Sequence, residues 1–253
     1  MVIIFRLILS VIFVPLISIG SYADDKAQRI ELISKHFRLQ KPEGKGKFPV
    51  VMLVPGCHGF NFDTAKDHYD RAQDLLVELG FATLRIDSLA VRNAATCNEV
   101  GSGKVADDIY FVAEFLHDQN FVKKDALNVM GWSWGGACAL QALKKTKNRK
   151  PANVNAVVAY YPSCWIISSW DSEIPVLAFF GAVDNITPFS DCESLIKNLS
   201  KPHKFTYRIY DNAHHQFDMA NLPSKLKRYY GTVGYNEQAA ESAWKEVSKF
   251  LKR

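Results

Sequence analysis

The chain has 253 residues, of which 48% are hydrophobic and 23% are charged. This length is sufficient for a hydrophobic core, and the composition excludes a disordered or collagen-like chain. Lys and Arg total 31 against 26 Asp and Glu, and the net charge of +5 is too small for this length to indicate nucleic-acid binding.

The first 23 residues have the features of a secretory signal peptide. Arg6 is their one charged residue before the apolar stretch from Leu7 to Ile19, which is shorter than the roughly 20 residues needed to cross a bilayer. Ser21 and Ala23 place small residues at the −3 and −1 positions of a cleavage site. We predict a signal peptide over residues 1–23, cleaved after Ala23, and a secreted or periplasmic protein. The alternative is an uncleaved anchor.

Apolar runs and helical periodicities alternate along the rest of the chain. Short apolar runs such as 49–54 are typical of strands buried on both faces, and apolar residues at helical spacing, as in 105–116, indicate amphipathic helices. We expect strands at 30–39, 49–54, 81–86, 126–132, 154–161, 176–180 and 205–210, and helices at 67–79, 105–116, 135–145, 188–199 and 237–251.

This alternation predicts an α/β fold with a mostly parallel central sheet and helices on both faces. The chain shows no internal repeat and no long linker, so we predict one domain over residues 24–253. In such sheets functional residues gather at the carboxyl ends of the strands. The loops after residues 54, 132, 180 and 210 are therefore the places to look for a site.

Ser133 lies at the centre of a G-x-S-x-G pattern between a predicted strand and a predicted helix. A serine hydroxyl is a poor nucleophile, and it must be held on a sharp turn where a histidine can reach it. Gly131 and Gly135 lack a Cβ, so the strand and the helix can close around that turn. We predict Ser133 as a nucleophile. The alternative is a glycine-rich helix start that merely packs closely.

An acid and a base follow Ser133 in the chain. Asp184 comes after the strand at 176–180, and the adjacent His214 and His215 come after the strand at 205–210. The order Ser, Asp, His is that of α/β-hydrolases. We expect Asp184 to orient an imidazole that acts as general base and then general acid. The residues alone leave the choice between the two histidines open, and Asp184 has the alternative role of a turn residue.

Other residues of the same types are weaker candidates. Asp191 lies inside a predicted helix, and Asp211 is too close to the histidine pair to act as a separate arm. The remaining histidines near these segments are interpreted as solvated surface residues: His36, His68, His117 and His203.

Two backbone N–H groups are expected to form an oxyanion hole. One belongs to Trp134, which follows the predicted nucleophile, and the other to the loop at 55–59, where Cys57 is the first candidate and His58 the second. The alternative for that loop is an ordinary glycine turn. Aromatic residues near these segments are candidates for an acyl pocket, although aromatics also fill cores: His58, Trp132, Trp134, Tyr161 and Trp165.

Taken together, these residues resemble the dienelactone hydrolase family, which has the α/β-hydrolase fold. The similarity runs from about Phe48 to the last helix. It is carried by Gly56-Cys57-x-Gly59, Asp87-Ser88…Arg92…Cys97, Gly131–Gly136, Tyr161-Pro162-x-Cys164, Gly181-x-x-Asp184-x-x-Thr187-Pro188…Cys192, Ala213-x-His215-x-Phe217-Asp218 and Tyr235-Asn236…Ala239-Ala240…Ala243-Trp244.

The resemblance narrows the choice of site residues that the residue types alone left open. The family pattern Ala-x-His-x-Phe selects His215 over His214 and supports Asp184. Dienelactone hydrolases carry a cysteine at the position of Ser133, so the resemblance implies a serine member with general esterase activity.

The five cysteines contain no CxxC pair, which argues against zinc or thioredoxin-like chemistry. Export permits disulfides. On the resemblance we predict the bridges Cys57–Cys97 and Cys164–Cys192, with Cys138 free and buried. The alternative is five reduced, packed thiols.

The sequence thus predicts an exported serine hydrolase that cleaves a carboxylic ester, lactone or similar acyl bond through an acyl-enzyme. An acyltransferase or peptidase with the same residues, or a non-catalytic binding protein on this scaffold, remains open. No metal or cofactor is implied. The expected partner is a small acyl substrate, with no nucleic acid and no membrane beyond an uncleaved signal, while the oligomeric state and the physiological substrate stay open.

Overall fold

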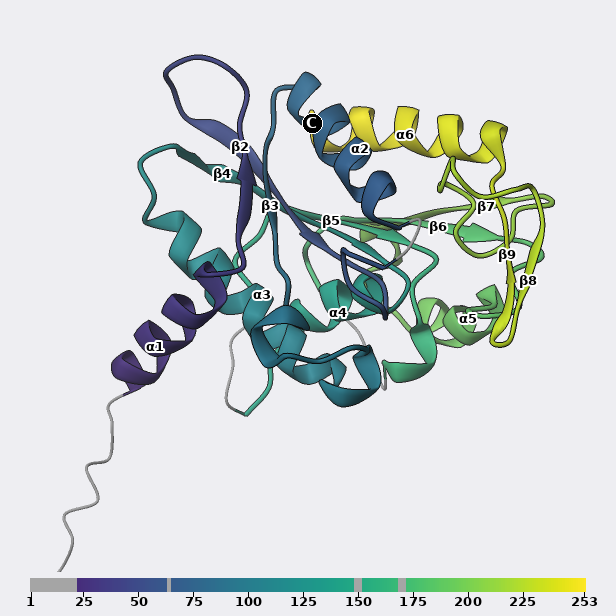
Figure 1. The fold of residues 1–253 in the computed structure, drawn as a ribbon, viewed down its shortest axis with the longest axis horizontal. Helices are drawn as coiled ribbons and strands as arrows, with labels where there is room; N and C mark the ends of the chain where they lie inside the picture. Colours follow the sequence, from purple (N-terminus) through teal and green to yellow (C-terminus); the bar gives the residue numbers. More distant parts are fainter. Residues whose placement is uncertain (1–21, 63–64, 148–151, 168–171) are drawn as a thin grey trace, which may run out of the picture.

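The computed structural model describes residues 22–62, 65–147, 152–167 and 172–253, so most of the predicted signal peptide lies outside the described residues. In this part of the chain a seven-stranded sheet has the order β1-β3-β2-β4-β5-β6-β7 (Figure 1). Strand β1 runs antiparallel to β3, and the other neighbours are parallel. The strands are β1 Arg38–Gln40, β2 Phe48–Val54, β3 Ala82–Arg85, β4 Val122–Trp132, β5 Ala156–Tyr160, β6 Val176–Gly181 and β7 Phe205–Tyr210.

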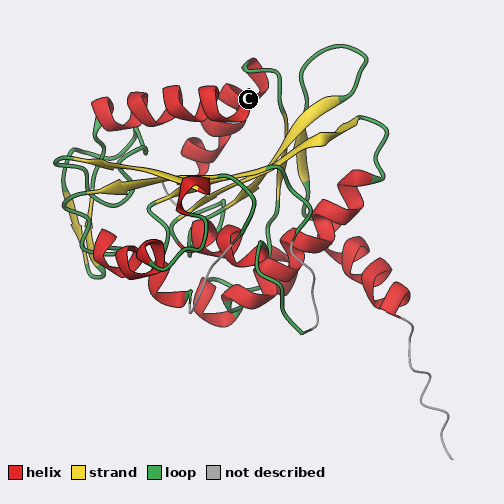
Figure 2. Cartoon of the chain, turned by 180° about the vertical axis from the view of Figure 1, so that it is seen from behind, coloured by secondary structure: helices red, strands yellow, loops and turns green. Residues whose placement is uncertain are grey.

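Helices cover both faces of this sheet. Helices α2 and α6 pack on one face, and α1, α3, α4 and α5 pack on the other (Figure 1, Figure 2). Their bounds are α1 Tyr22–Ser34, α2 Ala65–Glu78, α3 Ser102–His117, α4 Trp134–Ala142, α5 Phe189–Lys197 and α6 Glu237–Leu251. The predicted α/β architecture is confirmed.

Strand β2 shows why its sequence is apolar without interruption. Val50, Met52 and Val54 belong to the core beneath α3 and α4, whereas Val51 and Leu53 belong to the core beneath α2 and α6. All five side chains are completely buried. Because successive side chains of a strand point to opposite faces, a central strand with helices on both sides needs apolar residues at every position.

The predicted strand at 30–39 is wrong over most of its length. Helix α1 continues to Ser34, and only the three residues of β1 are extended. Ile30, Ile33 and Phe37 recur at spacings of three and four, which is a helical period, and Ile33 is fully buried while the other two pack on the same core. A second sheet of two short strands, β8 Leu226–Arg228 and β9 Gly231–Val233, was not predicted at all.

The last helix begins as its sequence indicates. The side chain of Asn236 accepts a hydrogen bond from the backbone N–H of Ala239 at 3.0 Å, which makes Asn236 the N-cap of α6.

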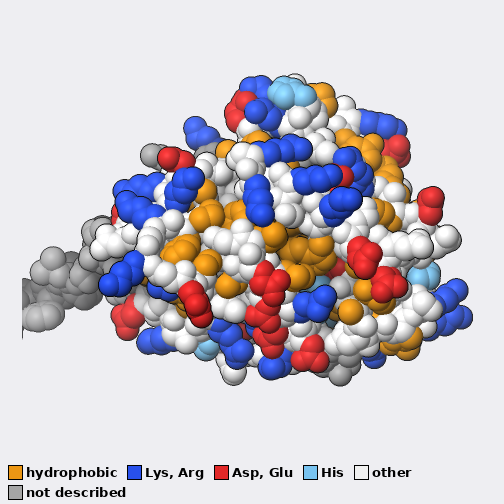
Figure 3. Space-filling view, turned by 90° about the horizontal axis from the view of Figure 1, so that it is seen from above, with side chains coloured by type: hydrophobic (Ala, Val, Ile, Leu, Met, Phe, Trp, Pro, Cys, Tyr) orange, Lys and Arg blue, Asp and Glu red, His pale blue; other side chains and the backbone are white. Residues whose placement is uncertain are grey.

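The face of the molecule seen from above α2 and α6 mixes basic, acidic and hydrophobic side chains (Figure 3). Within the described residues, every helix is too short or too polar to cross a membrane.

Candidate active site

Three sequence-distant segments meet at the carboxyl edge of the sheet. Ser133 joins β4 to α4, Asp184 follows β6, and His215 follows β7. Strands β4 to β7 are consecutive neighbours in the sheet, so the loops that leave them lie side by side. This is the edge at which open α/β sheets place their sites.

The turn at Ser133 is strained and tightly enclosed. Its backbone has φ 53° and ψ −120°, a region that residues with a Cβ rarely adopt. A Cβ on Gly131 would lie 2.4 Å from the carbonyl oxygen of Gly135, and one on Gly135 would lie 2.2 Å from that of Pro55. The two glycines therefore let the end of β2, the end of β4 and the start of α4 touch. The half-buried Ser133 side chain is left facing the pocket.

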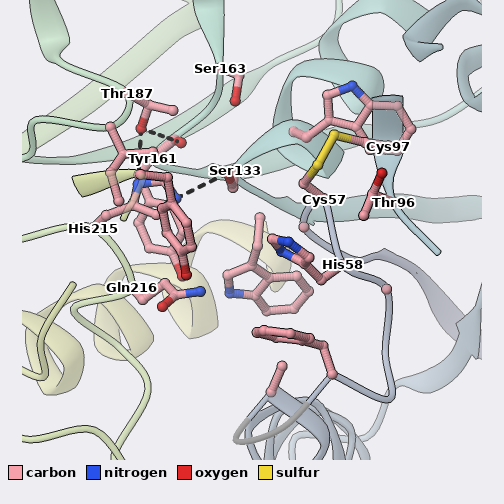
Figure 4. Close-up of a pocket in the computed structure, with 18 of the residues that line it drawn as sticks. Cys57, His58, Thr96, Cys97, Ser133, Tyr161, Ser163, Thr187, His215 and Gln216 are labelled. Carbon is pink, nitrogen blue, oxygen red and sulfur yellow. Dashed lines mark hydrogen bonds between the residues drawn. A yellow bond between two sulfur atoms is a disulfide. The ribbon is translucent and has the colours of Figure 1, made fainter. Parts of the chain in front are cut away.

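The structure brings the three predicted residues into one hydrogen-bonded series. Figure 4 shows its link between Ser133 and His215. Ser133 Oγ lies 3.0 Å from Nε2 of His215, and Nδ1 of His215 lies 2.8 Å from Oδ2 of Asp184. The side chains of His215 and Asp184 are buried. His214 takes no part in these hydrogen bonds. Its Nδ1 lies 3.2 Å from the carbonyl oxygen of Val183 instead.

The Asp184 carboxylate is held by several donors. Its Oδ1 accepts hydrogen bonds from the backbone N–H groups of Ile186 and Thr187 at 2.8 and 3.0 Å. The Thr187 hydroxyl lies 3.0 Å from Oδ2 and 3.1 Å from Nδ1 of His215. Burial raises the pKa of Asp184, but attraction to His215 and these hydrogen bonds outweigh it and hold the pKa below its usual value. The carboxyl group is therefore ionised at neutral pH.

A buried polar cluster supports this chain from behind. The ring of Tyr161 packs on that of His215 with centroids 4.5 Å apart, and its hydroxyl donates to Oδ1 of Asp218 at 2.6 Å. Trp132 Nε1 donates to Oδ2 of Asp218 at 2.8 Å. His68 lies 3.5 Å from the same oxygen and is buried, so its interpretation as a solvated surface residue was wrong. Desolvation lowers the pKa of His68, and Asp218 opposes the shift only in part.

Both predicted sources of backbone donors face the same pocket. Trp134 is the first residue of α4, where the helix dipole is positive. Cys57 and Trp134 line the pocket together with Ser133. The N–H of Gly56 already donates to the Tyr69 hydroxyl at 2.8 Å, which leaves the amide of Cys57 as the next along the loop.

The cysteines are paired as predicted. Cys57 bonds to Cys97, Cys164 bonds to Cys192, and Cys138 is free and buried. In Figure 4 the Cys57–Cys97 bridge lies on the opposite side of Ser133 from His215 and Tyr161. The loops after β2 and β3 are thereby joined beside the pocket.

The pocket has a volume of about 340 Å³. Its lining includes the predicted His58, Trp132, Trp134, Tyr161 and Trp165. Several lining residues were not predicted, because they come from the loop after β2, from α2 and from the segment between β7 and β9: Phe62, Tyr69, Met219, Tyr229 and Tyr230. Thr187 is part of the family pattern, but a role for it in the site was not predicted. Among the described residues, no group of three or more His, Cys, Asp or Glu side chains is arranged to bind a metal.

A mostly parallel sheet covered on both faces, with a Ser-His-Asp chain at its carboxyl edge, defines an α/β-hydrolase fold. A model of the dienelactone hydrolase family matches residues 36–253, and the chain belongs to that family. A Bradyrhizobium protein named "Probable 2-oxo-3-(5-oxofuran-2-ylidene)propanoate lactonase" is 24% identical over 237 residues, which cover 85% of this chain and 87% of that protein.

Solved structures agree on the fold. The propionate-bound esterase 2 of Thermogutta terrifontis has a TM-score of 0.62 at 13% identity, covering 85% of this chain and 88% of the esterase. The dienelactone hydrolase of Anabaena variabilis has a TM-score of 0.59 at 16% identity, covering 85% and 90%. The family membership identifies this chain as a hydrolase.

Proposed function

We propose that the chain is a serine hydrolase that opens small carboxylic esters or lactones through an acyl-enzyme. The observation that carries this proposal is the continuous chain from Ser133 Oγ through His215 to Asp184, with the hydroxyl facing a pocket. The esterase and lactonase named among its relatives support the same two substrate types.

Ser133, His215 and Asp184 each have a role in the proposed acylation. Ser133 Oγ attacks the carbonyl carbon while its proton passes to Nε2 of His215, and Asp184 stabilises the resulting imidazolium. The backbone N–H groups of Cys57 and Trp134 hold the oxyanion. His215 then gives its proton to the leaving alkoxide, and the acyl group remains on Ser133.

Deacylation repeats these steps with water. His215 takes a proton from the water as its oxygen attacks the acyl carbon, and the proton returns to Ser133 Oγ when the carboxylic acid departs. For a lactone the released alcohol stays attached to the acyl group, so the product is a hydroxy acid. The buried, ionised Asp184 serves both halves of the cycle.

A panel of p-nitrophenyl esters of graded chain length, with a lactone and a peptide, tests the proposal. We expect Ser133→Ala to lower kcat/KM on the esters by ~10⁴-fold or more. Ser194→Ala, on the exposed side of α5, is the matched control and keeps full activity. A Ser133→Ala protein that retains wild-type turnover contradicts the proposal, and turnover of the peptide alone indicates a peptidase.

We also propose that the chain is exported after cleavage behind Ala23. The two disulfides support an oxidising compartment. Cleavage there removes the first two residues of α1, which begins at Tyr22, and leaves Arg29 with its hydrogen bond to Asp108. Sequencing of the mature protein should begin at Asp24, and a start at Met1 contradicts cleavage.

A further inference from the structure

The pocket beside Ser133 is free of formal charge along its described lining, where none of the residues is Lys, Arg, Asp or Glu. Its titratable side chains near the mouth include His58, and partial burial lowers the pKa of that imidazole, so it is neutral at pH 7. A substrate carboxylate that entered this pocket would lose water without gaining a cationic partner. Burial of an unpaired charge is strongly unfavourable.

The mouth of the pocket is aromatic instead. Phe62, Trp165 and Tyr229 line it and are 37%, 69% and 93% exposed. A cluster of large, solvent-exposed apolar side chains around a cavity is typical of a ligand-binding site. His58 stacks on Phe62 with ring centroids 4.4 Å apart, and Tyr229 packs edge-on to Tyr230 at 4.9 Å. The rim therefore offers several ring faces to a bound molecule.

The size of the cavity limits the substrate. Its volume of about 340 Å³ is near the lower end of the roughly 300–1,000 Å³ that small-molecule pockets span. A single aromatic ring with a short acyl or alcohol part suits a pocket of this size, whereas a long acyl chain or a large ring system does not.

We propose that the pocket selects small, uncharged esters that carry an aromatic ring and rejects esters that carry a carboxylate, with Trp165 and Tyr229 contacting the ring. This inference rests on the proposed hydrolase function of Ser133. The ester carbonyl lies at Ser133, and the ring extends toward the aromatic rim. The preference follows from two independent properties of the lining, its lack of charge and its aromatic content.

A matched pair of substrates tests the electrostatic half. Methyl 4-acetoxybenzoate and 4-acetoxybenzoate share the acetyl group and the ring, but one carries a neutral methyl ester where the other carries a carboxylate, and the release of acetate is measured for both. Each kcat/KM is divided by the hydroxide-catalysed rate of the same ester, which removes the difference in leaving-group reactivity. We expect the neutral ester to be preferred by about threefold or more, because the carboxylate lies against the aromatic rim, where it loses part of its water and meets no cation. Equal normalised values overturn the inference and leave the hydrolase function standing.

A substitution tests whether a cation added at the mouth of the pocket improves hydrolysis of the carboxylate-bearing ester. Tyr229 is almost fully exposed, so Tyr229→Arg places a cation at the mouth without disturbing the core. We expect this variant to raise the normalised rate on 4-acetoxybenzoate relative to its methyl ester by about threefold or more, and added salt to reduce the gain. An unchanged ratio overturns the electrostatic half of the inference.

Benzyl acetate and cyclohexylmethyl acetate test the aromatic half, because they have similar size and leaving groups but differ in aromaticity. We expect the wild type to prefer the benzyl ester, and Trp165→Ala and Tyr229→Ala each to reduce this preference by about 2- to 10-fold. Tyr229→Phe keeps the ring and the preference. Leu39→Ala, an exposed apolar residue on β1, is the control that leaves the ratio unchanged.

The outcomes separate the two levels of the proposal. A wild-type enzyme that hydrolyses both acetates equally, or alanine variants that keep the wild-type ratio, overturn the aromatic assignment while esterase activity remains. Failure to hydrolyse any ester in either pair or in the p-nitrophenyl panel counts against the hydrolase function itself.

Discussion

Two adjacent histidines illustrate how much depends on single positions. His215 is buried against Tyr161 and bonds to both Ser133 and Asp184, whereas His214 points to the carbonyl of Val183 at a more exposed position. Both have the same chemistry and the same place in the chain to within one residue. The residue types alone do not separate them; the family pattern favours His215, and the fold places it between Ser133 and Asp184.

This difference leads to a direct comparison. We expect His215→Ala to lower kcat/KM by ~10⁴-fold or more, because the variant lacks the proposed general base and general acid. His214→Ala should change it less than about threefold, since the His214 ring bonds to the backbone oxygen of Val183 and not to Ser133 or Asp184. Ester hydrolysis by the two purified variants checks this, and equal losses contradict the assignment of His215.

The ionisation of Asp184 links the site to the stability of the fold. Its pKa is below the ordinary value of 3.8, so the ionised carboxylate stabilises the fold at pH values above that value. This contribution is lost as the pH falls through the folded-state pKa. We expect the difference in unfolding free energy between wild type and Asp184→Asn to be larger at about pH 7 than at about pH 2. Urea unfolding at both pH values measures it, and a pH-independent difference contradicts the expectation.

At the scale of elements, two partly buried arginines and one buried carboxylate join α1, α3 and the loop before α3. Asp108 of α3 is fully buried and accepts two hydrogen bonds from Arg92, at 2.6 and 3.0 Å, and one from Arg29 of α1 at 3.1 Å. The loop that carries Arg92 leads to Cys97 and so to the pocket. The cluster therefore fixes a loop that borders the site.

Removal of this carboxylate should be costly. We expect Asp108→Ala to lower the unfolding free energy by about 3–5 kcal/mol, because two guanidinium groups lose their buried partner. Asp118→Ala, at an exposed position at the end of the same helix, should change it by less than about 0.5 kcal/mol. Denaturant unfolding compares them, and similar losses in the two variants contradict a structural role for the cluster.

Most elements were predictable because their sequences carry one of two signals. The uninterrupted apolar run of β2 indicates a buried strand, and the apolar residues of α3 recur at helical spacing. The stretch at 30–39 was misassigned because it contains both the end of α1 and most of the three-residue strand β1, so the helical spacing of its apolar residues was taken for part of a strand. The three-residue strands β8 and β9 are too short to show any period.

The site divides in the same way. Ser133, Asp184 and the histidine pair were predictable because each lies in the segment after a strand and their order is that of α/β-hydrolases, and the family pattern then selected His215. Phe62 and Tyr229 were not, because they reach the pocket from loops whose paths depend on the packing of the whole chain. Thr187 acts through both its backbone and its hydroxyl, and a single threonine gives no signal of that role.

At the scale of the whole molecule, two disulfides fasten loops on one side of the sheet. Cys57–Cys97 joins the loops after β2 and β3, and Cys164–Cys192 joins the segment after β5 to α5. The first lies beside Ser133 and includes a residue proposed to hold the oxyanion. The two bridges are expected to differ in their effect on catalysis.

We expect the double variant Cys57→Ser/Cys97→Ser to lower both the unfolding free energy, by roughly 2–5 kcal/mol, and kcat/KM on esters. Cys164→Ser/Cys192→Ser should lower the unfolding free energy within the same range, with a smaller loss of kcat/KM, because this bridge carries no proposed oxyanion donor. Unfolding curves and ester hydrolysis of the two variants distinguish these effects. Full activity without the first bridge contradicts its role in holding the loop.

The most direct test of the account is to react the mature protein with a fluorophosphonate and to locate the adduct by peptide mass spectrometry. The account predicts one stoichiometric adduct on Ser133, absent from Ser133→Ala and strongly slowed in His215→Ala. An adduct at another residue, or an unlabelled protein that still hydrolyses esters, would contradict it.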